Sequence, residues 1–187
     1  MKSKTYTIAY RRKREGKTNY KKRLNLLKSG ELRLVVRQSS NSVQVQLIEY
    51  VPAGDKVVAS AHSKELQKYD WKHIKNNMPT AYLVGLLAGK KAVKAGIKKA
   101  ILDIGFYKSA KGSKVYAVLK GIVDGGLEVP VKEEMFPKQE RISGKHIEDF
   151  YKKAQEDKEK FKNQFSKSDV SNLTKAFEEV KAKIMQV

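Results

Sequence analysis

The sequence predicts an α/β fold: an open mixed sheet in the element order β-β-β-α-β-α, with helices on one face, a basic N-terminal arm before it and appended C-terminal helices after it. Three strand-like segments come first, and two helical segments separated by a short apolar segment follow them. Both ends of the chain differ from this middle part in composition. We therefore expect an arm over residues 1–30, an α/β core domain over 31–130 and a helical extension over 131–187.

The first thirty residues are strongly basic, with Glu15 as the only acid within the cationic cluster. No apolar face is visible before Leu24, so this segment alone cannot offset the entropy that ordering it would cost. We expect the arm to become ordered only against a partner. The cluster comprises Arg11, Arg12, Lys13, Arg14, Lys17, Lys21, Lys22 and Arg23.

Three segments rich in valine and isoleucine predict antiparallel strands over residues 32–37, 42–50 and 56–62, separated by polar and Pro/Gly-containing turns. In the second, apolar residues alternate with polar ones, as in a sheet with one buried and one polar face. The apolar set is Val43, Val45 and Leu47, and the polar set is Ser42, Gln44 and Gln46.

Residues 79–95 predict a helix that Pro79 opens and Gly96 closes. The segment is apolar on nearly all sides, which indicates a buried helix. Gly85 and Gly89 lie four residues apart, and we expect them to let this helix approach the sheet closely.

The apolar segment 100–104 predicts a buried strand, which a crossover connection would place parallel to the earlier ones. A second helix follows, from a Ser113 cap to Gly125 and Gly126, with apolar residues at spacings of three and four.

Two more apolar stripes lie beyond residue 130, and their helices need a partner surface. We expect these helices to pack on the core domain rather than on a neighbouring macromolecule. The stripes are Ile147, Phe150, Tyr151 and Ala154, and then Leu173, Phe177, Val180 and Ile184.

The net charge of the chain indicates that its partner is an anionic macromolecule or surface. Forty Lys and Arg residues against 20 Asp and Glu leave a net charge of +20 in 187 residues. Such an excess is typical of proteins that bind phosphates, as on nucleic acid or an anionic membrane, and nucleic acid is the commoner case.

The chain has no cysteine, which excludes disulfides and thiolate metal sites. With no signal peptide or membrane-spanning segment in the sequence, we expect a cytoplasmic protein.

Two surfaces are candidates for RNA contact. The arm combines its cations with Tyr10 and Tyr20, whose rings could stack on unpaired bases. A solvated charge run or a localisation signal is the competing interpretation. The polar sheet face could read RNA edges and 2′-hydroxyls, or it could simply be hydrated, and composition leaves these two open. It offers Arg37, Gln44, Gln46, Ser60 and His62.

Catalytic and metal-binding patterns are missing from the sequence. The three histidines, His62, His73 and His146, lie far apart, and no metal or cofactor is expected. Asp103 has no obvious second carboxylate for a two-metal site, so we expect a structural role for it, such as bonding the backbone turn before Gly105. We predict that the protein is not an enzyme.

A co-linear series of motifs resembles one family. It comprises Arg-Arg-Lys-Arg-Glu-Gly-Lys-Thr-Asn-Tyr at 11–20, Arg-Leu-Val-Val-Arg-Gln-Ser-Ser-Asn at 33–41, Ser-Ala-His-Ser at 60–63, Ala-Tyr-Leu-Val-Gly-Leu-Leu-Ala-Gly at 81–89, Ala-Ile-Leu-Asp-Ile-Gly at 100–105, Lys-Gly-Ser-Lys-Val at 111–115, and Phe-Pro at 136–137 with Glu-Arg-Ile at 140–142. On these residues the chain is similar to archaeal members of the universal large-subunit ribosomal protein family that binds 5S ribosomal RNA, numbered eighteen in bacteria and archaea and five in eukaryotes. The segment after about Gln155 departs from that pattern.

This resemblance implies a structural protein of the large ribosomal subunit. Its expected partners are 5S rRNA, 23S rRNA and neighbouring ribosomal proteins of the central protuberance, including the other 5S-binding protein, with no membrane and no DNA. The family pattern assigns RNA contact to 23 residues: Arg11, Arg12, Lys13, Arg14, Lys17, Thr18, Asn19, Tyr20, Lys21, Lys22, Arg23, Arg37, Ser39, Asn41, Gln44, Gln46, Ser60, His62, Ser63, Tyr107, Lys108, Lys111 and Lys114.

Two other classes remain open at this stage. An RNA-processing enzyme on a ribonuclease-like sheet would show metal-dependent cleavage. A non-specific polyanion or membrane-surface binder would bind according to charge alone.

Overall fold

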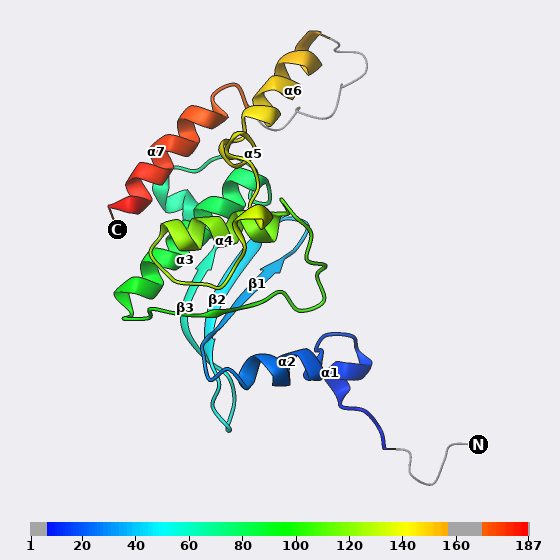
Figure 1. Cartoon of the computed structure of the whole chain (residues 1–187). Coiled ribbons are helices and arrows are strands. Elements are labelled where there is room, and N and C mark those ends of the chain that lie inside the picture. The colour runs from blue at the N-terminus through cyan, green and yellow to red at the C-terminus, as the bar shows by residue number, and fades with distance from the viewer. Residues whose placement is uncertain (1–6, 157–169, 187) are drawn as a thin grey trace, which may run out of the picture.

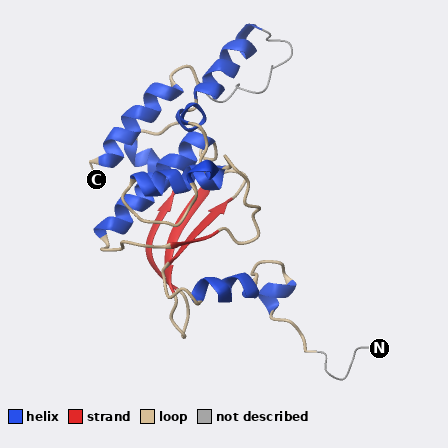
Figure 2. Ribbon diagram, in the orientation of Figure 1, coloured by secondary structure: helices blue, strands red, loops and turns tan. Residues whose placement is uncertain are grey.

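A computed structural model describes residues 7–156 and 170–186 and confirms the predicted α/β class (Figures 1 and 2). Four strands form one mixed sheet in the order β3-β2-β1-β4. The strands are β1 (Arg33–Gln38), β2 (Val43–Glu49), β3 (Lys56–His62) and β4 (Ile101–Asp103). The helices are α1 (Arg11–Arg14), α2 (Tyr20–Leu27), α3 (Met78–Lys94), α4 (Lys114–Asp124), α5 (Gln139–Ser143), α6 (Lys145–Glu156) and α7 (Leu173–Met185), with 3₁₀ turns η1 (Ser63–Tyr69) and η2 (Glu133–Met135).

The pairing of the strands follows the sequence prediction. β1 and β2 are antiparallel with Arg37 opposite Gln44, and β2 and β3 are antiparallel with Gln44 opposite His62. β4 runs parallel to β1, as expected for a strand that returns to the sheet through a helix. The register of β2 and β3 shifts between Leu47 and Ile48.

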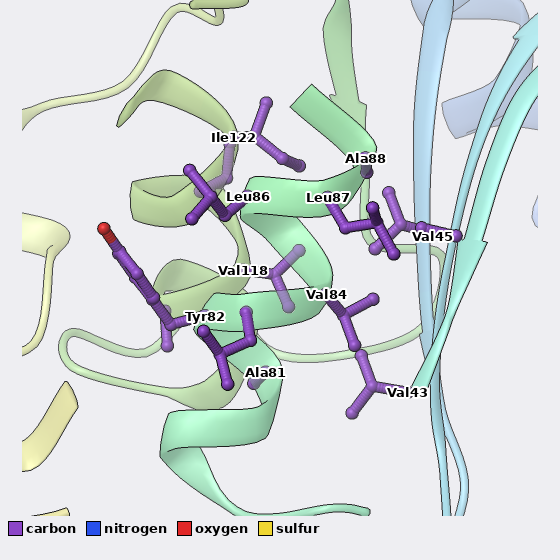
Figure 3. Close-up of a cluster of buried hydrophobic side chains, with 14 of the residues drawn as sticks. Val43, Val45, Ala81, Tyr82, Val84, Leu86, Leu87, Ala88, Val118 and Ile122 are labelled. Carbon is purple, nitrogen blue, oxygen red and sulfur yellow. The ribbon is translucent and has the colours of Figure 1, made fainter. Parts of the chain in front are cut away.

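One face of the sheet is buried and the other is polar. Val43, Val45 and Leu47 of β2 are at most 1% exposed, whereas Gln44 between them is exposed. Figure 3 shows Val43 and Val45 facing Val84 and Leu87 of α3. The helix α3 therefore covers the apolar face of β2, and α4 packs against α3. Residues of α2 line a cavity together with Gln46, so the arm lies on the polar side of the sheet.

The two glycines of α3 contact α4 rather than the sheet, which corrects our expectation. A Cβ on Gly85 would lie 2.1 Å from the carbonyl oxygen of Val118, and one on Gly89 would lie 2.7 Å from that of Ile122. Gly121 of α4 faces α3 equally closely, since its Cβ would lie 2.2 Å from the carbonyl oxygen of Tyr82. Side chains such as Val84 and Leu87 lie between α3 and the sheet, whereas the backbones of α3 and α4 approach each other closely at these glycines.

The helix ends match the predicted signals in part. Gly96 after α3 and Gly126 after α4 have φ angles of 74° and 100°, which favour glycine. The cap of α3 is Asn77, whose side chain accepts a hydrogen bond from the backbone N–H of Thr80 at 3.0 Å. Ser113 takes the N-cap position of α4 as predicted, but its side chain makes no cap hydrogen bond.

The helix α7 packs on the core domain, as its apolar stripe predicted. Leu173, Phe177, Val180 and Ile184 are at most 2% exposed. The ring of Phe177 lies 5.5 Å from that of Tyr82 on α3. The Tyr82 hydroxyl donates to Asp124 at 2.7 Å, and burial together with this carboxylate raises the pKa of Tyr82 well above its usual value.

A carboxylate of α6 bonds the first turn of α7. Glu148 Oε1 accepts from the backbone N–H of Thr174 at 2.6 Å and from its hydroxyl at 2.7 Å. Much of the segment after Gln155 that departs from the family pattern, residues 157–169, lies outside the described residues. The boundary between the core domain and the helical extension at residue 131 stays a prediction. In the structure, α7 contributes side chains to the same hydrophobic core as the α/β domain.

Candidate nucleic-acid interface

Five charged side chains of alternating sign form a chain of ion pairs beneath the arm. Arg23 of α2 pairs with Asp55 at 2.8 Å, and Asp55 pairs with Arg33 of β1 at 2.7 Å. Arg33 also reaches Asp103 of β4 at 3.3 Å, and Asp103 pairs with Arg37 at 3.2 Å. Because Arg33 is only 4% exposed, it needs both carboxylates close by. The network joins the arm, the β2–β3 turn and two strands.

Asp103 has the structural role expected from the sequence. Its Oδ1 accepts from the backbone N–H of Gly105 at 2.8 Å, which bonds the turn after β4. Arg33 lies between Asp103 and Asp55 and pairs with both, so these carboxylates are already neutralised by arginine. The described residues contain no group of three or more side chains suited to hold a metal ion.

The arm is built from two short helices around local hydrogen bonds. Asn19 caps α2 by accepting from the backbone N–H of Lys22 at 3.0 Å, and Thr18 accepts from Arg12 Nε at 2.8 Å. The rings of Tyr10 and Tyr20 lie 5.2 Å apart. Thr18 and Asn19, both among the predicted contacts, therefore shape the arm. Its free cations remain exposed, namely Lys13, Arg14 and Lys21 among others.

The core domain itself provides contacts for the arm, which differs from the expectation that only a separate partner would order it. Besides the Arg23–Asp55 pair, Lys22 Nζ donates to the carbonyl oxygen of Gly105 at 3.4 Å. Both contacts come from adjacent residues of α2, one to the β2–β3 turn and one to the turn after β4. The helix α2 is therefore held against the core domain beside the polar face.

A cavity of about 300 Å³ lies between the arm and the sheet. Its lining includes Val35, Gln46 and Ile48 of the sheet and Phe106, which is 58% exposed. Six cationic side chains and only two carboxylates line it, so its field attracts anions. The cations are Arg12, Lys17, Lys22, Arg23, Arg33 and Arg37.

The polar residues of β2 and β3 form two adjacent cross-strand pairs, Gln44 with His62 and Gln46 with Ser60. His62 Nδ1 accepts from the backbone N–H of Lys64 at 3.0 Å. Because that nitrogen is an acceptor, the neutral ring carries its proton on Nε2, where it can be donated. Two amides, a hydroxyl and a ring N–H therefore lie side by side.

A third group of predicted residues meets at the β1–β2 hairpin. Asn76 Nδ2 donates to the carbonyl oxygens of Ser39 at 2.7 Å and Ser40 at 2.9 Å, and Lys114 Nζ donates to Asn76 Oδ1 at 3.1 Å. The hydroxyl of Tyr107 donates to the carbonyl oxygen of Gln38. The hairpin and the 107–114 loop thus form one continuous surface, with Asn41, Lys108 and Lys111 exposed on it.

Ser63 is the predicted contact that the structure places away from the surface. It is 0% exposed, and its hydroxyl accepts from the backbone N–H of Val43 at 3.2 Å. Ser63 follows His62 in the motif because β3 ends at His62 and η1 begins at Ser63.

Four residues at the site were missed. Arg33, Asp55 and Asn76 position predicted residues, and Phe106 borders the cavity. An arginine amid the apolar residues of a predicted strand is unusual, and Arg33 could have been singled out on that ground.

The chain matches the family model described as ribosomal large subunit proteins 60S L5 and 50S L18 over residues 4–99 and 93–132. The matched ranges include the arm from residue 4, all four strands and the 107–114 loop, and they end before α5. Among the described residues, no helix is both long and apolar enough to cross a membrane.

Proposed function

Because the chain belongs to the family of ribosomal large subunit proteins 60S L5 and 50S L18, we propose that it binds 5S rRNA and helps attach it to 23S rRNA in the central protuberance. Membership makes it a structural rather than a catalytic protein and places it in the large subunit of the cytoplasmic ribosome, among ribosomal RNA and other ribosomal proteins. The choice of 5S rRNA as the main RNA partner is the proposal.

The observation that supports the proposal best is the cationic cavity between the arm and the polar sheet face. Its lining combines six positive side chains with apolar and aromatic surface. Cationic side chains bind phosphates whatever the sequence, whereas flat apolar surface next to polar groups suits unpaired bases. A folded RNA with exposed loops or bulges fits this mixture better than a regular duplex, whose bases are covered.

We assign complementary roles to the three surfaces. The exposed cations of the arm bind phosphates and dominate affinity, while the Gln44–His62 and Gln46–Ser60 pairs contact base edges or 2′-hydroxyls. The hairpin and the 107–114 loop, with Lys108 and Lys111, extend the contact beyond the sheet. Of the 23 predicted contacts, we leave out only Ser63.

A non-specific polyanion binder is the competing function. It would need only the cations and would make no use of the neutral pairs on β2 and β3. The arrangement of uncharged donors and acceptors beside the cationic cavity therefore favours selective RNA binding.

The test is a filter-binding titration of the purified protein with 5S rRNA, competed with transfer RNA at several salt concentrations. We expect a preference for 5S rRNA that persists at moderate salt. Equal affinity for both RNAs, falling together as salt rises, would contradict the proposal and leave only charge-driven binding. Heparin and anionic vesicles as additional competitors separate RNA selectivity from attraction to polyanions in general.

A further inference from the structure

A second groove, unlike the cationic cavity, opens at the edge of the sheet next to β4. It has a volume of about 670 Å³ and lies between residues 99–101, the end of α4 and the segment 128–136. Its lining is mainly apolar, and the side chains that matter here are Ile101, Val123, Val129, Val131 and Phe136. Ser29 and Glu31, from the linker between α2 and β1, also line it.

The charge of this groove is opposite to that of the whole chain. Three carboxylates line it, Glu31, Glu128 and Glu133, against the single cation Lys99. Lys99 Nζ lies 3.7 Å from Glu128, which leaves Glu31 and Glu133 as an acidic rim. In a protein with a net charge of +20, such a rim repels phosphates and attracts basic side chains.

The backbone beside the groove is also suited to a protein partner. β4 is an edge strand, and just before it Lys99 forms a short parallel bridge with Glu128. There the backbone N–H of Ala100 donates to the carbonyl oxygen of Glu128 at 3.0 Å. An edge strand next to apolar pockets is the usual geometry for binding an extended peptide.

We propose that this groove receives an extended segment of a neighbouring ribosomal protein, with apolar side chains in the groove and lysine or arginine beside Glu31 and Glu133. The occupant follows from charge complementarity, because acidic rims reject RNA and the apolar lining needs a protein side chain. The inference rests on the place of the chain in the large subunit and does not depend on which RNA the cationic cavity binds.

Site-specific photocrosslinking in assembled subunits tests this. The photoreactive residue p-benzoylphenylalanine is placed at the exposed groove residue Pro130, and separately at Lys99 so that a folding defect at one position does not decide the outcome. Gln67, exposed on η1, is the control position. Large subunits purified from cells that carry only the variant protein are irradiated, and mass spectrometry identifies the crosslinked peptide. We expect both groove positions to reach one segment that contains apolar residues next to lysine or arginine.

Charge reversal provides the second measurement. Glu31→Lys with Glu133→Lys should lower the crosslink yield about fivefold, as expected for two rim ion pairs. Glu140→Lys with Glu179→Lys makes the same change in net charge at exposed positions outside the groove and should leave the yield unchanged. Equal yields in the two pairs would overturn the proposal. So would crosslinks to RNA, to another part of this chain or to an acidic segment, or a yield no higher than at Gln67.

The filter-binding assay on the same variants separates the two proposals. Glu31→Lys with Glu133→Lys should keep the preference for 5S rRNA, because the altered residues do not line the cationic cavity. If the unaltered protein shows no such preference, the proposed RNA partner fails, and the crosslinking result still decides on the groove.

Discussion

The guanidinium of Arg37 donates two hydrogen bonds to Asp103, one to its backbone carbonyl oxygen at 2.8 Å and one to Oδ1 at 3.2 Å. The parallel pairing of β1 with β4 brings the two residues together. Arg37 is therefore held in one orientation at the wall of the cationic cavity, and part of its charge is already paired. Asp103 acts as a positioning residue for a proposed RNA contact.

Replacing Asp103 by Asn should weaken both stability and RNA binding. The amide keeps an acceptor for Gly105 but removes the charge that faces Arg33 and Arg37, which should lower the unfolding free energy by about 1–3 kcal/mol. Affinity for 5S rRNA should fall roughly three- to tenfold, the equivalent of about 1 kcal/mol for a displaced charged hydrogen bond. Urea unfolding and filter binding give the two values. Glu49→Gln, the same change at an exposed carboxylate, serves as the control, and equal effects would refute this role.

The glutamines of β2 should affect RNA binding but not folding. Gln44→Leu with Gln46→Leu removes the polar groups of two amides from the face opposite the core, so the urea midpoint should stay nearly constant. Affinity for 5S rRNA should fall about tenfold if each amide makes one hydrogen bond to RNA. Gln67→Leu with Gln139→Leu, at exposed positions elsewhere, is the control. Unchanged affinity would mean that this face is only hydrated.

The cations of α1 should contribute to the salt dependence of binding. Lys13 and Arg14 are exposed, and their replacement by Gln should reduce the slope of log affinity against log salt by about 0.7–0.9 for each phosphate that is no longer neutralised. The slope comes from titrations at several salt concentrations. Lys94→Gln with Lys175→Gln removes the same charge outside the arm, and a reduction there as large as in α1 would argue that net charge alone binds RNA.

The contact between α3 and α4 should not tolerate a methyl group. In an ordinary helix Gly→Ala stabilises by up to about 1 kcal/mol. At Gly85 the new Cβ would lie 2.1 Å from the carbonyl oxygen of Val118, so the helices would have to separate. We expect Gly85→Ala to lower the unfolding free energy by about 2 kcal/mol or more, as measured by urea unfolding. An increase in stability would show that the two helices are less closely packed.

The packing of α7 on α3 should contribute substantially to stability. Phe177→Ala removes a side chain that is 0% exposed and lies against Tyr82, which should cost about 3–5 kcal/mol. Met185→Ala on the same helix, where the side chain is 45% exposed, should cost far less. Thermal unfolding of both variants measures the difference. Similar losses would indicate that α7 contributes little to the core.

Local patterns in the sequence predicted the elements of the fold well. The alternation of Val43, Gln44 and Val45 has the period of a strand, and it correctly predicted which face of β2 is buried. Gly96 and Gly126 marked helix ends because only glycine adopts their positive φ angles easily. These features are predictable because each depends only on residues that are close together in the sequence.

Relationships between distant residues were predicted less well. The spacing of Gly85 and Gly89 indicates that some backbone comes close, but it does not say whether a sheet or a helix provides it. Arg33 and Asp103 are 70 positions apart, and only the pairing of β1 with β4 joins them. Ser63 shares a motif with His62, yet it turns inward while His62 stays at the polar face.

The hydrogen bond from Lys22 to Gly105 spans 83 positions of the chain. During synthesis the arm therefore leaves the ribosome long before the turn that receives it. At about 5–20 residues per second, the delay is roughly 4–17 seconds. Until that interval ends, the nascent chain exposes its most cationic segment without the complete surface on which it docks, in a cytoplasm rich in RNA. The newly made protein thus passes through a stage in which it attracts RNA by charge before it has the folded surface that we propose to select among RNAs.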